Sequence, residues 1–175
     1  FFMMALSWIN VPLYVLAYPN PSNAYKEQNK LREAVGITVN PISFSAFRGA
    51  KKALKEGYAL ATGIDRPLDN PEDSKYKPVF FGRPAAIPTF YARLCLETGA
   101  IAHVACGSRQ EDGTFIIDAS PPIIMEARDD LMEENLVNVA KVLEPTEAFI
   151  RKHASDWSMF YPVWPEVQPL IKNIL

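Results

Sequence analysis

The sequence predicts an α/β domain with a mainly parallel sheet, an antiparallel edge hairpin and helices on both faces of the sheet. Two observations support this fold class. Short apolar runs alternate with amphipathic helical segments through the first 64 residues, which is the order of strand–helix–strand units with parallel strands. Two further strand-like runs flank the turn sequence Glu111-Asp112-Gly113, which favours a hairpin. With 175 residues the chain can bury one core, and we expect a single domain over residues 1–175.

The composition excludes several classes of protein. An apolar fraction of 49% and a charged fraction of 22% are typical of a folded chain and not of a disordered one. A net charge of −2 provides no basic field, so no nucleic-acid partner is expected. Cys95 and Cys106 are too few and too far apart for a disulfide framework, and their apolar surroundings favour free buried thiols in a reducing compartment.

The first nine residues form an aromatic-rich apolar run that ends before Asn10. This run predicts the end of a helix, and a core-facing helix end is favoured over membrane contact through Phe1, Phe2 and Trp8. The chain opens in mid-pattern and shows neither the basic region nor the cleavage site of a signal peptide. We therefore expect an N-terminally truncated domain.

Three short strands and two helices are predicted before Asp65. Gly36 and Gly57 are expected to end the two helices, because glycine readily takes the left-handed conformation that follows a helix. Ser43 or Ser45 is expected to cap the second helix. The predicted strands cover residues 13–18, 37–39 and 58–64, and the predicted helices cover residues 24–35 and the segment between these serines and Gly57.

The second half of the chain predicts a helix, a hairpin and two more helices. Apolar residues at helical spacing begin at Phe90, and Gly99 ends that helix. Strands at 100–106 and 114–119 should pair antiparallel. Pro145 should interrupt the following helix and begin another that runs to about His153. The helix over residues 129–143 is expected to turn Leu131, Met132, Leu136, Val139, Ala140 and Leu143 inward.

A central block from Val79 to Thr89 is too apolar for an ordinary loop and too rich in Gly and Pro for a helix. Gly82 lets the backbone turn, while Pro84 fixes its own φ and favours an extended Arg83. A guanidinium on such stiff backbone suits a phosphate or carboxylate ligand. The alternative is a structural loop in which Arg83 pairs with a local acid.

Asp65 follows the third predicted strand, and ligands of open α/β sheets bind beyond the carboxyl ends of the strands. We expect Asp65 and the central block to lie close together as a candidate site. The alternative is that Asp65 caps its loop and pairs with Arg66 or Arg83.

The two histidines give little support for catalysis. His103 lies in a predicted apolar strand and is expected to be a satisfied core residue, whereas His153 lies at a helix C-terminus, where a partly charged imidazole is favourable without function. The sequence has no G-x-S-x-G, P-loop, G-x-G-x-x-G or H-E-x-x-H motif. A hydrolase triad, a nucleotide-binding loop and a zinc-protease site are therefore not indicated.

Several motifs, taken in order, resemble the bacterial lipid A biosynthesis acyltransferases of the lysophospholipid acyltransferase superfamily. The central Gly-Arg-Pro block is fairly specific in combination with the tryptophans downstream of it, whereas each motif alone is weak. The resemblance covers Leu13 to about Trp164. Its motifs are Arg32-Glu33-x-x-Gly36, the lead-in from Leu54 to Gly57 before the strand that ends at Asp65, Phe81-Gly82-Arg83-Pro84-Ala85 with Pro88-Thr89, and the closing Trp157, Phe160 and Trp164.

The resemblance implies a glycerol-3-phosphate acyltransferase-like fold and transfer of a fatty acyl group. The donor would be a thioester of acyl carrier protein or coenzyme A, with no further cofactor, and the acceptor would be a hydroxyl of a membrane glycolipid or phospholipid. The enzyme would act at the cytoplasmic face of the bacterial inner membrane, as a peripheral protein or anchored through a preceding segment. The family's catalytic base is a His with an acid five residues on. This chain lacks that pair, which by the family's order would precede Phe1, so the fragment alone is expected to be inactive.

The resemblance also implies roles for particular residues. Arg32 would aid catalysis or grip an anionic group, and Asp65 would help to shape the catalytic site. Arg83 would clamp a phosphate of donor or acceptor. The substrate-binding set is Arg66, Phe81, Gly82, Arg83, Pro84 and Thr89.

Two departures from the family pattern bear on the acceptor. Tyr18 stands where the family often has Arg before Pro, and Tyr161-Pro162-Val163 replaces a His-Arg-Arg run. Loss of these cations favours an acceptor charged differently from a highly phosphorylated lipid A precursor. Two other function classes stay open: a non-catalytic lipid- or carrier-protein-binding module, and a small-molecule-binding α/β regulatory domain.

Overall fold

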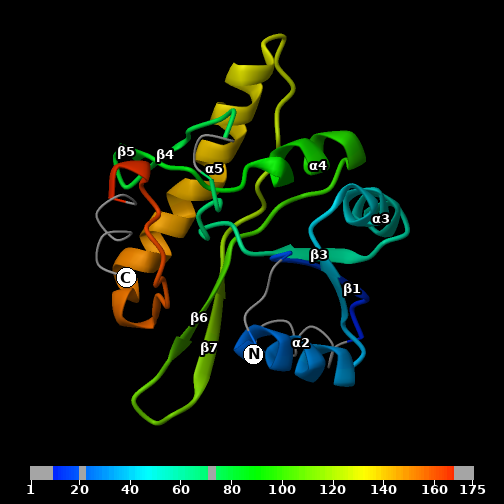
Figure 1. Ribbon diagram of the computed structural model, residues 1–175, viewed down its shortest axis with the longest axis vertical. Coiled ribbons are helices and arrows are strands. Elements are labelled where there is room, and N and C mark those ends of the chain that lie inside the picture. The colour runs from blue at the N-terminus through cyan, green and yellow to red at the C-terminus, as the bar shows by residue number, and fades with distance from the viewer. Residues whose placement is uncertain (1–9, 20–22, 71–73, 168–175) are drawn as a thin grey trace. The chain divides into compact units, whose positions relative to one another are not determined.

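The computed structural model of the protein describes residues 10–19, 23–70 and 74–167 (Figure 1). The chain divides into two compact units, Phe1–Gly63 and Ile64–Leu175, and each is described by itself. The helix end predicted within residues 1–9 and the tail after residue 167 lie outside the described residues.

The first unit is a parallel sheet with the strand order β2-β1-β3. β1 (Leu13–Ala17) pairs with β2 (Thr38–Pro41) on one side and with β3 (Ala59–Thr62) on the other. Helix α2 (Asn23–Ala34) connects β1 to β2, and α3 (Phe44–Lys55) connects β2 to β3. The second crossover runs back past β1, so right-handed connections place the two helices on opposite faces of the sheet (Figure 1).

Side chains of β1 alternate between these two faces. Leu13 and Val15 pack with Ile37 in an apolar cluster, whereas the Tyr14 hydroxyl donates to the Ala46 carbonyl of α3 at 3.1 Å. The βαβαβ order and the alternation were predictable because both follow from local apolar patterning.

The predicted ends of the helices are confirmed. Ser43 is the N-cap of α3, and its hydroxyl accepts the Ala46 N–H at 3.1 Å, which settles the choice between the two serines. Gly36 and Gly57 have φ angles of 81° and 85°, the left-handed conformation expected after α2 and α3.

In its described residues, the second unit combines two α-helices with two small antiparallel hairpins. In the first hairpin β4 (Val79–Phe80) pairs with β5 (Arg83–Pro84), and in the second β6 (Ala105–Arg109) pairs with β7 (Phe115–Ala119). The fold class is confirmed as α/β. In the described ranges the β6–β7 hairpin forms a sheet of its own, separate from the parallel sheet. The helices are α4 (Phe90–Thr98), α5 (Leu131–Lys152) and the short 3₁₀ turns η2 (Ala154–Asp156) and η3 (Pro165–Val167).

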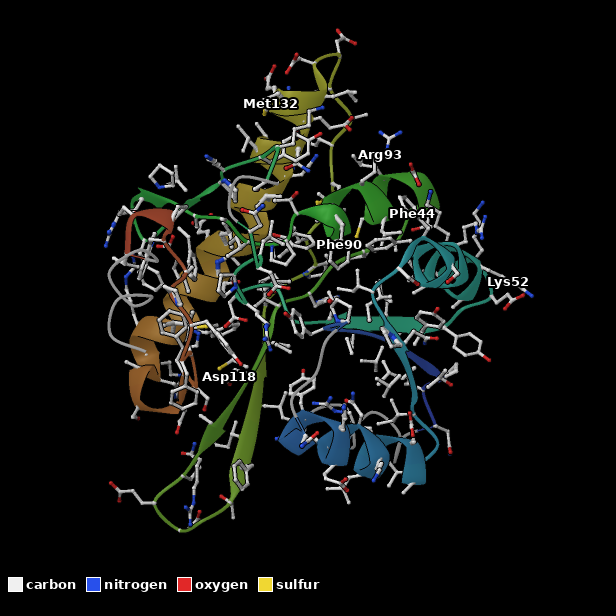
Figure 2. All side chains as sticks on the ribbon, viewed as in Figure 1. Phe44, Lys52, Phe90, Arg93, Asp118 and Met132 are labelled. Carbon is white, nitrogen blue, oxygen red and sulfur yellow. The ribbon has the colours of Figure 1, made fainter. Side chains whose placement is uncertain are left out.

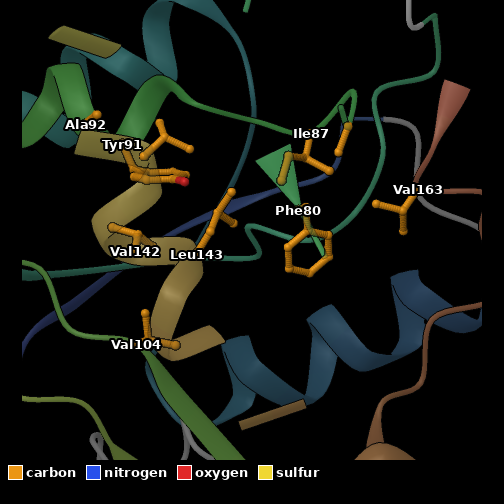
Figure 3. Close-up of a cluster of buried hydrophobic side chains, with 10 residues drawn as sticks. Phe80, Ile87, Tyr91, Ala92, Val104, Val142, Leu143 and Val163 are labelled. Carbon is orange, nitrogen blue, oxygen red and sulfur yellow. The ribbon is translucent and has the colours of Figure 1, made fainter. Parts of the chain in front are cut away.

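The core of this unit lies where α4, α5 and the central block meet. Phe80 and Val139 are fully buried there, and Tyr91 and Leu143 pack in the same cluster (Figure 3). The other buried members come from these same three elements, from the residue before β6 and from the closing segment: Ala85, Ile87, Ala92, Val142, Val104 and Val163.

The strand predicted at residues 100–106 is wrong in position. β6 begins only at Ala105, and before it Ala102 makes an isolated antiparallel bridge to Ile123. His103 is therefore exposed and not a core residue, with its Nδ1 3.0 Å from the Ser120 carbonyl oxygen. The apolar character of this run comes from Val104, which enters the core from irregular backbone.

Two expectations for α5 are also wrong. Pro145 lies inside a continuous helix and does not begin a new one. The buried Val142 and Thr146 pack on either side of it, and their burial offsets the one hydrogen bond that a proline removes. The inward face is misplaced as well: Leu131 and Met132 are 56% and 39% exposed, and Figure 2 labels Met132 at the start of the helix. Val139 and Leu143 are buried as predicted, and the first turns bury Glu134, Asn135 and Asn138 instead.

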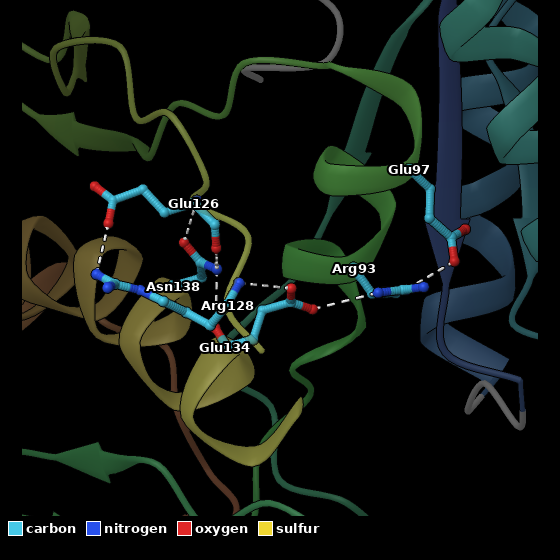
Figure 4. Close-up of polar contacts among 6 residues, drawn as sticks. All are labelled: Arg93, Glu97, Glu126, Arg128, Glu134 and Asn138. Atoms are coloured by element: carbon cyan, nitrogen blue, oxygen red, sulfur yellow. Dashed lines mark hydrogen bonds and ion pairs between the residues drawn. The ribbon is translucent and has the colours of Figure 1, made fainter. Parts of the chain in front are cut away.

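A polar network explains this reversed face (Figure 4). Asn138 is fully buried, accepts the Glu126 N–H at 2.8 Å and donates to the carbonyls of Glu126 and Glu134, also at 2.8 Å. The Glu134 carboxylate accepts the Arg128 N–H at 3.1 Å and Arg93 Nη1 at 3.3 Å. Buried polar groups are tolerated when they are hydrogen-bonded, and here they fasten the preceding segment to α5.

Candidate active site

The central block forms a two-residue hairpin whose loop is Phe81 and Gly82. Pairing of β4 with β5 brackets these two residues, and their φ angles are 51° and 75°. A type I′ turn requires positive φ at both loop positions, which glycine adopts without strain. The expected stiff turn at Gly82 is present, with Arg83 and Pro84 in the return strand.

Arg83 is half-exposed and engaged on two sides. Its Nε donates to Glu166 Oε1 at 2.9 Å, and its Nη2 donates to the same oxygen. The guanidinium carbon lies 4.9 Å from the centroid of the Trp164 ring, so a cation–π contact orients its plane. Arg83 does pair with an acid, but that acid is 83 residues away in sequence and is not the local partner of the alternative.

Glu166 responds to this environment. Its own backbone N–H and, next, the Arg83 guanidinium hold the pKa of the Glu166 carboxyl below its usual value. The pair is a carboxylate held by a guanidinium, which is the same recognition that an anionic ligand of Arg83 would use.

Phe81 is held by helix α5. Its backbone N–H donates to Glu147 Oε1 at 2.7 Å, although the two residues are 66 apart in sequence. Glu147 Oε2 in turn accepts Arg151 Nη2 at 2.7 Å, and the Arg151 guanidinium lies 4.8 Å from the centroid of the Phe81 ring. Helix α5 therefore contacts both the backbone N–H and the ring of Phe81.

Trp157 joins Asp65 to the central block. Its indole Nε1 donates to Asp65 Oδ2 at 2.7 Å, and its ring lies 6.1 Å from the Phe81 ring and 6.2 Å from the Phe80 ring. The Leu68 N–H also donates to the Ala86 carbonyl at 2.8 Å, which ties the loop after Asp65 to the block. The structure thus brings Asp65 and the block together with an indole between them.

Trp164 fastens the block from a second point. Its Nε1 donates to the Phe80 carbonyl at 3.0 Å, and its ring stacks on Phe80 at 6.4 Å. The intervening Val163 is buried in the core. The segment from Trp157 to Glu166 therefore contacts the block at several points, through Trp157, Trp164 and Glu166.

The other substrate-binding candidates lie around this frame. The Arg66 guanidinium is 4.3 Å from the centroid of the Tyr161 ring. Pro84 is exposed in β5, and Thr89 is the N-cap residue of α4 without a side-chain capping bond. Arg32 belongs to the first unit, in the last turn of α2, where its Nη1 donates to Asn29 Oδ1 at 2.6 Å.

A second group of titratable side chains lies on the β6–β7 hairpin and the end of α5. Asp118 Oδ2 accepts Lys152 at 3.1 Å and lies 3.7 Å from His153 Nε2. The Lys152 hydrogen bond holds the pKa of the Asp118 carboxyl below its usual value. Asp118 pairs across the hairpin with Cys106, a free thiol whose pKa is raised mainly by burial.

The sequence did not point to Glu147, Arg151 or Glu166 as parts of this site. Glu147 and Arg151 stand four residues apart on a helix, which predicts an ion pair but does not say that the pair holds a turn 66 residues away. Glu166 follows the last family motif and has no distinguishing neighbour in the sequence.

Within residues 10–19, 23–70 and 74–167, no group of three His, Cys, Asp or Glu side chains is placed to hold a metal ion. No helix in these ranges combines the length and apolar character that crossing a bilayer requires.

Comparison with known proteins identifies the family. A model of the bacterial lipid A biosynthesis acyltransferases matches residues 11–166, a range that includes Asp65, the central block and Trp157. A search of curated proteins gave no significant match. Members of the matched family are O-acyltransferases that use an acyl donor and a lipid acceptor. Since the match spans most of the chain, the protein belongs to the bacterial lipid A biosynthesis acyltransferase family.

Proposed function

We propose that this chain forms the substrate-gripping part of an enzyme that transfers a fatty acyl group to a lipid hydroxyl. The donor is a thioester of acyl carrier protein or coenzyme A, and the acceptor is a membrane glycolipid or phospholipid. Family membership supports the reaction type. The observation that carries the proposal is Arg83, a half-exposed guanidinium fixed on a rigid turn and already binding a carboxylate.

In this proposal Arg83 clamps a phosphate of the donor or the acceptor. Trp164 holds the plane of the guanidinium, so little rotamer freedom is lost when a ligand binds. A phosphate has more charge and more acceptor oxygens than the Glu166 carboxylate, and it displaces that carboxylate from Nε and Nη2.

Asp65 serves as a positioning group. Trp157 fixes its Oδ2, and its Oδ1 accepts a hydrogen bond from the acceptor lipid. Arg32 acts as a second grip for an anionic group, and Arg66 and Thr89 contact the substrate. The histidine base of the family is not among the residues of this chain, so these side chains contribute binding and orientation. The enzyme works at the cytoplasmic face of the bacterial inner membrane, as a peripheral protein or anchored through a preceding segment.

The test is acyl transfer by the protein made from its complete gene, in membranes, with radiolabelled acyl carrier protein and coenzyme A thioesters. Arg83→Gln should lower kcat/KM by about tenfold to a hundredfold, the loss expected for one charge-assisted contact. Arg83→Lys keeps the charge but loses the planar donor geometry of the guanidinium. Its kcat/KM should lie between those of the wild type and of Arg83→Gln. Arg109→Gln, at an exposed arginine of β6, is the matched control and should keep wild-type activity.

The acceptors should include a phosphorylated glycolipid, an uncharged glycolipid and a phospholipid. Equal activity of Arg83→Gln and Arg109→Gln on every acceptor would contradict the proposed role of Arg83 as a phosphate clamp. If the protein binds lipid or carrier protein tightly but transfers no acyl group, the result would favour a non-catalytic binding module over an enzyme.

A further inference from the structure

Phe81 occupies a position that an aromatic residue rarely takes. The first loop residue of a type I′ turn needs positive φ, for which Asn, Asp or Gly are the ordinary choices. At φ 51° a residue with a Cβ carries a cost of about 1–2 kcal/mol. Backbone strain of this kind persists where the surroundings over-determine it, and such places are often functional.

Glu147 stabilises the strained conformation of the turn. The N–H of the first loop residue does not take part in the two-stranded ladder, so the Phe81 N–H needs a partner from elsewhere. Glu147 Oε1 provides that partner at 2.7 Å, from a side chain that is only 17% exposed. A hydrogen bond to a carboxylate in a partly buried place is stronger than one to a neutral acceptor.

The strained residue couples two parts of the proposed site. Arg83 begins the return strand two residues after Phe81, so the turn sets the direction of its side chain. On the other side, the Phe81 ring lies 6.1 Å from the Trp157 ring, whose indole N–H holds Asp65. An ordinary Asn-Gly turn would present Arg83 but would lack the aromatic contact that leads to Asp65.

We propose that Glu147 is a positioning residue of the acyltransferase, which acts by holding the Phe81–Gly82 turn so that Arg83 and Asp65 keep a fixed relation. Arg151 supports this role, because it pairs with Glu147 Oε2 and covers the Phe81 ring. The inference rests on the proposed function of Arg83 and Asp65, but its structural half can be tested without acyl transfer.

The first measurement is hydrogen exchange at the Phe81 amide in the folded protein. Glu147→Ala should speed exchange at this amide by about tenfold or more, since the charged acceptor is lost. Glu147→Gln keeps an amide oxygen as acceptor and should retain most of the protection. Glu144→Ala, at an exposed acid one turn earlier on α5, should leave Phe81 unchanged. Equal exchange in all four proteins would overturn the inference, whatever the activity.

The second measurement is steady-state acyl transfer at a temperature well below the melting point of every variant. Glu147→Ala should lower kcat by about tenfold to a hundredfold, the scale of a small misplacement of reacting groups, with a smaller change in KM. Glu147→Gln should rescue most of the loss, and Glu144→Ala should match wild type.

The two readouts separate the possible failures. Wild-type kcat in Glu147→Ala, together with fast Phe81 exchange, shows a turn that loosens without consequence and overturns the positioning role. A parallel loss of thermal stability and kcat in Glu147→Ala and Glu147→Gln shows a purely structural residue and also overturns it. Absence of acyl transfer in the wild-type protein, with Phe81 exchange as expected, refutes the proposed function and leaves Glu147 as a clamp of the turn alone.

Discussion

The two units of this chain hold their key segments by different means. In the first unit, backbone ladders join β1 to both neighbours, and the contact of Tyr14 with Ala46 spans 32 residues. In the second unit, the block around Phe81 and Arg83 has only a two-residue ladder, and side chains from 66 to 92 residues away supply its contacts and those of Asp65. The parallel sheet is thus secured by regular backbone pairing, whereas the candidate chemistry is secured by individual distant side chains.

This difference has a practical meaning for mutation. A regular ladder distributes its stability over many equivalent bonds, so single surface changes in the first unit should be tolerated. The block depends on a few individual side-chain contacts, so the loss of one of them removes a larger share of what holds it. The predictions below test this contrast, beginning with the largest expected effect.

Phe80→Ala should give the largest loss of stability, about 3–5 kcal/mol, because the ring is fully buried. The rings of Phe81, Trp157 and Trp164 pack on it at centroid distances of 4.7, 6.2 and 6.4 Å. Chemical denaturation gives the free energy of unfolding, and Phe44→Ala at a 91% exposed position is the control, with an expected change within about 0.5 kcal/mol.

Amide exchange of the Phe80→Ala protein sharpens the comparison. Loss of protection confined to residues after Gly63 would support two units that open separately. An equal loss of amide protection in β1 would show that the two units unfold together, which would contradict the contrast drawn between them.

Gly49→Ala tests the close packing of the first unit. A Cβ at Gly49 would clash with the Tyr14 hydroxyl oxygen and lie 3.2 Å from the ring carbon that bears it. The ring must move and its bond to Ala46 must stretch, at an overpacking cost of about 1–3 kcal/mol. Alanine gains about 1 kcal/mol over glycine inside a helix, so we expect a smaller net loss of stability in thermal or chemical unfolding. In a Tyr14→Phe background the closest atom is gone, and the same substitution should cost clearly less. An equal cost in both backgrounds would place the strain elsewhere.

The smallest effect is expected from the Arg83–Glu166 pair, because both side chains are about half-exposed. The pKa of Glu166 is lowered in the folded protein from its ordinary value of 4.5. Its contribution to stability is therefore fully present above pH 4.5 and is lost as the pH falls through the lowered pKa. NMR titration should show the pKa of Glu166 rising in Arg83→Gln, but only part of the way, since its own backbone N–H is the larger cause. An unchanged pKa in that variant would mean that the pair does not persist in solution.

The sequence predicted the first unit well, because its elements follow local rules. Gly36, Gly57 and Ser43 end or begin helices through their own backbone and side-chain chemistry, and the apolar runs are short and clearly bounded. Arg83 and Asp65 could be selected for a related reason: Arg83 lies between a glycine and a proline, and Asp65 follows a strand, and both features are visible in the sequence.

The second unit was harder to predict because distant partners override local patterns. Apolar Leu131 and Met132 are exposed, while Asn138 is buried, since its amide satisfies the backbone of Glu126 from 12 residues away. Pro145 would break an isolated helix, yet α5 continues through it within a packed core. Neither outcome is encoded in the periodicity of α5 itself.

The Glu166 carboxylate gives the resting protein a built-in competitor. Because Glu166 is part of the same chain, it lies beside Arg83 at a high effective concentration, and any free anion must outcompete it to bind. Singly charged solutes such as chloride or acetate compete weakly with Glu166 for the guanidinium, whereas a multiply charged headgroup that also makes other contacts can displace it. In the proposed function, this competition reserves the guanidinium for a ligand that arrives with several points of attachment.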